Sequence, residues 1–102
     1  MGINMTRGSG DIFRDLGFSK SEAEHLKLRS ELMLKVQKTV RARGVKQAEA
    51  ARLLGVRQPR VSDLMRGRLH LFSMETLIDM LGRLGIRVKL VMRPARGRAR
   101  VA

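Results

Sequence analysis

Apolar side chains recur every three or four residues through residues 19–43, which is the spacing of one face of an α-helix. The stripe and its flanks consist of Leu26, Leu28, Leu32, Met33, Val36 and Val40. Ser19 is followed three residues later by Glu22, which is the capping-box pattern of a helix N-terminus. Gly44 is typical of the position just past a helix C-terminus. The pattern therefore predicts one long helix that ends at residue 43.

Two short helix-forming runs follow, over residues 47–54 and 58–66. Two helices that cross steeply through a short turn need a small residue where their backbones approach, a residue that tolerates positive φ, and an apolar plug. Ala51, Gly55 and Val56 stand at these three places. The predicted core of the motif consists of Ala50, Ala51, Leu54, Gly55, Val56, Val61 and Leu64. The spacing therefore predicts a helix-turn-helix.

A further helix is predicted from residue 74 to a stop at Gly85, because Ser73 is a good N-cap and apolar residues then recur at helical spacing. From residue 86 the period changes from 3.6 to 2, which predicts a half-buried strand. Its inward face consists of Ile86, Val88, Leu90 and Met92.

A single strand leaves its backbone donors and acceptors unpaired. Antiparallel pairing with the same strand of a second copy, about a two-fold axis, would satisfy them. Two alternatives stay open: the segment packs on the helices as an extended tail, or it pairs with the apolar residues near position 12.

The 102 residues predict one domain, and the scarcity of aromatic residues favours a core of helices packed on helices. The predicted fold class is mainly α: a bundle of four to five helices with a helix-turn-helix, plus one C-terminal β-strand that pairs across a homodimer. The predicted organisation is a flexible leader with a short apolar segment over residues 1–18, the DNA-binding domain with its dimerisation strand over 19–93, and a basic disordered tail over 94–102.

The charge of the chain is unevenly distributed. Residues 1–31 hold five basic and five acidic side chains, whereas residues 32–102 hold seventeen basic and four acidic ones, so the whole net charge of +13 lies in the second part. A partner made of phosphates explains this excess best. Three phenylalanines are too few for the base stacking of single-strand binders. We therefore expect double-stranded DNA as the partner.

Little in the sequence points to catalysis. The chain has no cysteine, and His25 and His70 lie far apart without the spacing of a metal site, so we expect no metal and no cofactor. No phosphate-binding loop follows a strand, and no nucleophile stands beside a base, so we do not expect an enzyme. No apolar run approaches the roughly 20 residues that span a bilayer, and no signal peptide is visible. We expect a cytoplasmic, nucleoid-associated protein with no membrane partner.

The stretch QAEAARLLGVRQPRVSDLMRG, residues 47–67, resembles the Cro/cI-type (XRE) helix-turn-helix repressors. Over residues 15–93 the chain is similar to XRE-type antitoxins of the HigA kind, through the combination of QAEAA, LLGV, QPRVSDL, RGR and FSMETL. One departure is Lys46, because the family usually has Thr or Ser there as the N-cap of the first motif helix.

The resemblance implies that the helix from Gln58 lies in the major groove with its N-terminal side chains at base edges. The predicted base contacts are Arg57, Gln58, Arg60, Ser62 and Asp63. The predicted contacts to the DNA backbone are Lys46, Gln47, Arg66 and Arg68. A glutamine can pair with adenine, and an arginine with guanine. For Asp63, acceptance from cytosine and an ion pair with Arg60 or Arg66 both stay open.

The function that these patterns predict is a sequence-specific repressor that binds a near-palindromic operator as a dimer and serves as the antitoxin of a toxin-antitoxin pair. Two alternatives stay open. One is a protein-interaction module that neutralises a toxin, with DNA binding secondary; the charge-balanced residues 1–31 are its only hint in the sequence. The other is a nucleoid-type DNA binder without sequence preference.

Overall fold

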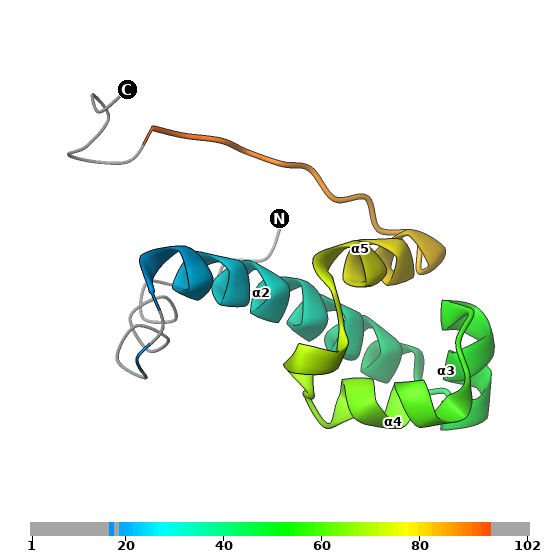
Figure 1. The fold of residues 1–102 in the computed structure, drawn as a ribbon. Coiled ribbons are helices and arrows are strands. Elements are labelled where there is room, and N and C mark those ends of the chain that lie inside the picture. The colour runs from blue at the N-terminus through cyan, green and yellow to red at the C-terminus, as the bar shows by residue number, and fades with distance from the viewer. Residues whose placement is uncertain (1–16, 18, 95–102) are drawn as a thin grey trace.

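The structure is a computed structural model that describes residue 17 and residues 19–94. These residues form four α-helices and one short 3-10 helix (Figure 1). In chain order they are α2 (Lys20–Arg43), α3 (Gln47–Leu54), α4 (Gln58–Met65), η1 (Leu69–Leu71) and α5 (Met74–Arg83). The prediction of a mainly helical fold with a helix-turn-helix is confirmed for this part of the chain. The predicted leader and basic tail lie outside it, except for Gly17 and Pro94.

Helix α2 runs the length of the molecule, and the other helices gather around its C-terminal half (Figure 1). Its capping box is confirmed: the Glu22 amide donates to Ser19 Oγ at 3.1 Å, and the Ser19 amide donates to Glu22 Oε1 at 2.9 Å. Gly44 ends the helix with φ 63°, as its position predicted. The local capping signals therefore define both ends of the longest helix.

One face of α2 is buried against the other helices, mainly α5. Met33, Val36 and Val40 belong to the core, in agreement with the predicted stripe. Leu28, which we expected to flank that stripe, is instead 47% exposed. The helices that cover α2 pack on its C-terminal half, so an apolar residue nearer its N-terminus is not automatically buried.

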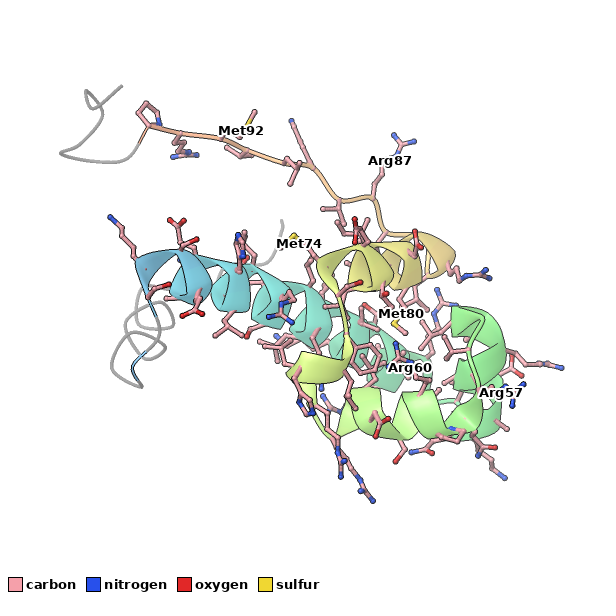
Figure 2. All side chains as sticks on the ribbon, in the orientation of Figure 1. Arg57, Arg60, Met74, Met80, Arg87 and Met92 are labelled. Carbon is pink, nitrogen blue, oxygen red and sulfur yellow. The ribbon has the colours of Figure 1, made fainter. Side chains whose placement is uncertain are left out.

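Every α-helix contributes to a single hydrophobic core. Its largest fully buried side chains are Val36, Leu54, Val61, Leu64, Phe72, Leu77, Met80 and Leu81. Phe72 follows η1 and is 1% exposed, so it lies between the helix-turn-helix and the start of α5. Met80 was not part of the apolar face predicted for the last helix, although Figure 2 shows it beneath α5. Because each helix buries only part of its surface, the four depend on one another for stability.

Helix α5 begins at Ser73, whose side chain accepts a hydrogen bond from the Thr76 amide at 3.1 Å. The N-cap predicted at Ser73 is thus confirmed. The last turn closes at Leu84, and the Ile86 amide donates to Leu81 O at 2.8 Å. This bond turns the chain out of the helix at Gly85, which has φ 84°.

The C-terminal segment, residues 86–94, leaves α5 as an extended chain (Figure 1). Ile86 and Val88 are half-buried against the core, and Arg87 beside them is exposed, so the predicted alternation is present at the start of the segment. Farther on, Leu90 is 76% exposed and Met92 is 90% exposed. Within residues 19–94 no backbone pairs with this segment, and no strand forms there. The predicted strand and its pairing across a homodimer therefore stay a hypothesis.

Candidate nucleic-acid interface

The turn between α3 and α4 is built on Gly55. This residue is in the left-handed region, with φ 71° and ψ 32°, which L side chains adopt only at a cost. The Val56 amide then donates to Ala51 O at 3.0 Å and closes the turn. A β-carbon at position 55 would lie 2.6 Å from Cζ of Arg83, so the guanidinium of α5 also lies directly over the glycine. Backbone conformation and close approach both favour glycine here.

The inner faces of α3 and α4 meet in the core, which sets the angle between them. The five inward residues are at most 8% exposed: Ala50, Ala51, Leu54, Val61 and Leu64. Val56 is half-buried and packs against the same cluster. With these side chains turned inward, the opposite face of α4 is left to solvent.

The C-terminal end of α4 is held by a residue that our sequence reasoning missed. Gln37 of α2 is 7% exposed, and its Nε2 donates to Leu64 O at 2.7 Å. The Gly67 amide donates to the same carbonyl at 3.0 Å. A signal for Gln37 exists in the sequence, because it lies four residues after Met33 and three before Val40 on the buried stripe of α2. A polar side chain in that stripe needs a buried partner.

The residues predicted to contact bases differ in their exposure. Arg57 and Gln58, at the N-terminal end of α4, are exposed, whereas Ser62 and Asp63 are half-buried. Nε of Arg68 lies 3.8 Å from Asp63 Oδ1, so Asp63 faces Arg68 and not the two arginines that the sequence suggested. The pair is partly solvent-exposed and therefore weak.

Arg60 points in another direction from its neighbours. Its Nη1 donates to Leu71 O at 2.9 Å, and its Cζ lies 4.1 Å from the centroid of the Phe72 ring. Figure 2 shows the side chain on the side of α4 that faces α5. The guanidinium thus contacts the chain between η1 and α5, and the residue is half-buried. Sequence spacing alone had grouped Arg60 with the outward residues.

The residues predicted to contact the DNA backbone, Lys46, Gln47, Arg66 and Arg68, are all exposed. Lys46 and Arg57 are the N-cap residues of α3 and α4, and neither makes a side-chain capping bond. The first amides of both helices therefore have no side-chain acceptor, unlike those of α2 and α5. Free amides, the positive end of the helix dipole and a cationic N-cap together favour an anion at these two helix ends.

Pro59 lies in the first turn of α4, where it removes no intrahelical hydrogen bond. Across the described residues, no three acidic or histidine side chains gather as a metal site. In the same part of the chain, none of the helices is long and apolar enough to cross a membrane.

The fold and the exposed face of α4 define a class of protein, and comparison with known proteins agrees. The family model described as a helix-turn-helix domain matches residues 12–93, so the chain belongs to the helix-turn-helix domain family. A solved structure of a "Putative XRE Family Transcriptional Regulator" is similar at 33% sequence identity and a TM-score of 0.68. The similarity covers 79% of this chain and 90% of that one. No curated protein matches the chain.

Proposed function

We propose that this helix-turn-helix protein is a DNA-binding transcription regulator of the XRE type that represses by occupying its operator. The observation that carries the proposal is the division of α4 into two faces. Val61 and Leu64 are buried, whereas Arg57 and Gln58 project from the N-terminal end of the same helix. A recognition helix enters the major groove with that end toward the bases. Bound in this way, the protein would block access to a promoter.

Two sets of contacts divide the work of recognition. Arg57, Gln58 and Ser62 would contact base edges, where a glutamine pairs with adenine and an arginine with guanine. The backbone contacts would come from Lys46, Gln47, Arg66 and Arg68. Contacts of this second kind orient the protein on the duplex and carry no sequence information directly. The uncapped N-termini of α3 and α4 support the assignment, because backbone amides there can donate to phosphate oxygens.

Replacing Gln58 with alanine is expected to weaken operator binding by about 1–3 kcal/mol and to relax the preference at one base pair. Gln58 is exposed, so the change should leave the stability of the domain intact. Binding to a panel of operators with single base-pair changes measures both effects. Gln47→Ala is the matched control and should weaken every operator equally.

The groove assignment is wrong if Gln58→Ala keeps the full preference of the parent protein. A parent whose footprint vanishes under random competitor DNA at fixed salt would favour the nucleoid-type alternative, which binds without sequence preference.

We propose further that two copies pair through the C-terminal segment, with Ile86, Val88, Leu90 and Met92 on the apolar side. The exposure of Leu90 and Met92 supports this arrangement, because a second copy would cover them. Antiparallel pairing about a two-fold axis also satisfies the extended backbone. Two recognition helices would then address half-sites about 34–36 Å apart on a near-palindromic operator.

Replacing Leu90 with arginine is expected to raise the dissociation constant of this dimer at least about tenfold. Two positive charges would be brought into a pairing that otherwise buries two leucines, and a loss of about 1.4 kcal/mol already corresponds to tenfold. Sedimentation equilibrium measures the constant. Val91→Arg is the matched control, since successive strand residues point to opposite faces. Equal dimerisation of Leu90→Arg and the parent would contradict the pairing.

A second candidate function is neutralisation of a toxin, which is compatible with repression. The specific observation in its favour is that Leu28 and Leu34 are 47% and 39% exposed on α2, outside the core. Co-expression with the product of an adjacent reading frame, followed by mass measurement of the complex, tests it. The antitoxin role predicts a complex of defined stoichiometry that Leu28→Glu weakens without affecting operator binding. If no complex forms, the antitoxin role is abandoned.

A further inference from the structure

Arg60 makes two interactions that tie α4 to a distant part of the chain. Its Nη1 donates to Leu71 O at 2.9 Å, and its Cζ lies over the Phe72 ring at 4.1 Å from the centroid. The ring is 1% exposed and belongs to the core. Eleven residues separate Arg60 from its carbonyl acceptor, so the contact is tertiary and not local.

Helix α4 needs such contacts to keep its orientation. It has eight residues, no side-chain N-cap and only slight contact with α2, so its position rests mainly on α3. Gln37 holds its C-terminal end through Leu64 O. Arg60 supplies the corresponding link nearer the N-terminal end, where the base-reading side chains project. A small rotation of α4 about its axis would displace those side chains from base edges.

A role for Arg60 in reading bases conflicts with these contacts. To reach a guanine, the guanidinium would have to leave both the carbonyl of Leu71 and the face of Phe72. Both interactions belong to kinds that favour arginine over lysine, since a planar guanidinium can stack on a ring and donate at its edge at once. The neighbouring Arg57 is exposed and makes no side-chain capping bond, so it is free to approach DNA without such a loss.

We propose that Arg60 is a positioning residue, which sets the angle of the recognition helix through Leu71 and Phe72 and does not read a base. This inference rests on the proposed function, because it concerns how that function obtains its specificity. Base preference then comes from Arg57, Gln58 and Ser62. Arg60 acts on all of them together, so its effect on affinity is the same for every operator.

The test compares Arg60→Ala and Arg60→Lys with the parent on the operator panel, at a temperature well below the unfolding midpoint of each variant. Both variants are expected to bind every operator about 5- to 30-fold more weakly, the range for loss of a partly desolvated cation–π contact. The relative preference at each base pair should not change. Arg60→Lys keeps the charge, so its log-log salt slope should equal that of the parent. Arg57→Ala serves as the control and should alter either the preference or the slope.

A second measurement follows the stack itself by NMR. The side-chain protons of Arg60 should keep the ring-current shift from Phe72 when DNA is bound, and Phe72→Leu should remove that shift. Its loss on DNA binding would overturn the proposal, because the guanidinium would then have left the ring.

Other outcomes of the binding panel also overturn the positioning role. A collapse of preference at one base pair in Arg60→Ala would assign Arg60 to base reading. Full affinity in Arg60→Lys, with a slope about one unit smaller in Arg60→Ala, would assign it to a phosphate. Unchanged affinity in both variants would leave it no role in binding. A parent chain that selects no operator would overturn the proposed function itself, and this inference with it.

Discussion

Replacing Leu64 with alanine is expected to lower the free energy of unfolding by about 2–5 kcal/mol, the range for truncation of a fully buried leucine. Leu64 is 0% exposed and lies in the core between the helix-turn-helix and α2. The change removes apolar contacts and leaves a cavity. A domain of this size is stable by only about 5–15 kcal/mol, so the variant would lose a large share of its stability. Denaturant unfolding followed by circular dichroism measures the difference.

The matched control is Leu34→Ala, on α2. Leu34 is 39% exposed, and alanine is a better helix former, so the same chemical change should cost less than about 1 kcal/mol there. If the two variants lose equal stability, Leu64 does not occupy the core position that its burial implies.

Raising the salt concentration from about 50 to 200 mM is expected to weaken operator binding about 10³-fold. The proposed backbone contacts include three cations in each protomer, Lys46, Arg66 and Arg68, and hence about six phosphates per dimer. Each phosphate contact releases condensed counterions, so the log-log slope should be about −5. Fluorescence anisotropy of a labelled operator over a salt series measures it.

The location of this surface is tested by removing charge at two places. The double variant Lys46→Gln with Arg66→Gln should reduce the slope to about −2, because four contacts per dimer are lost. The double variant Lys20→Gln with Lys27→Gln removes the same charge at the N-terminal end of α2, far from α4 (Figure 1), and should leave the slope unchanged. Equal reductions would mean that the charge acts diffusely and not through the proposed face.

The predicted helices agree with the structure wherever the signal is local. The capping box at Ser19, the N-cap at Ser73 and the left-handed glycines at positions 44 and 55 each depend on residues within one turn. The second motif helix was predicted over residues 58–66, and α4 ends one residue earlier, at Met65. Hydrogen-bond partners three or four positions away are contained in the sequence itself, so these features could be read directly.

The C-terminal segment shows where periodicity stops being sufficient. Alternation correctly indicated that Ile86 and Val88 turn toward the core. Whether a strand forms depends on a backbone partner, and the period of side chains does not name one. The exposed Leu90 and Met92 keep pairing with a second copy as a proposal that sedimentation can decide.

The candidate interface divides in the same way. The sequence by itself determined the helix-turn-helix, its glycine turn, its buried core and the basic character of the half of the chain that carries it, because spacing and composition encode these. Only the tertiary structure decided that Gln37 holds the end of α4, and that Arg60 turns back onto Phe72 while Arg57 faces solvent. The partners in those contacts are 27 and 12 positions apart in the sequence. Packing in three dimensions selects such partners, so no pattern along the chain could have named them.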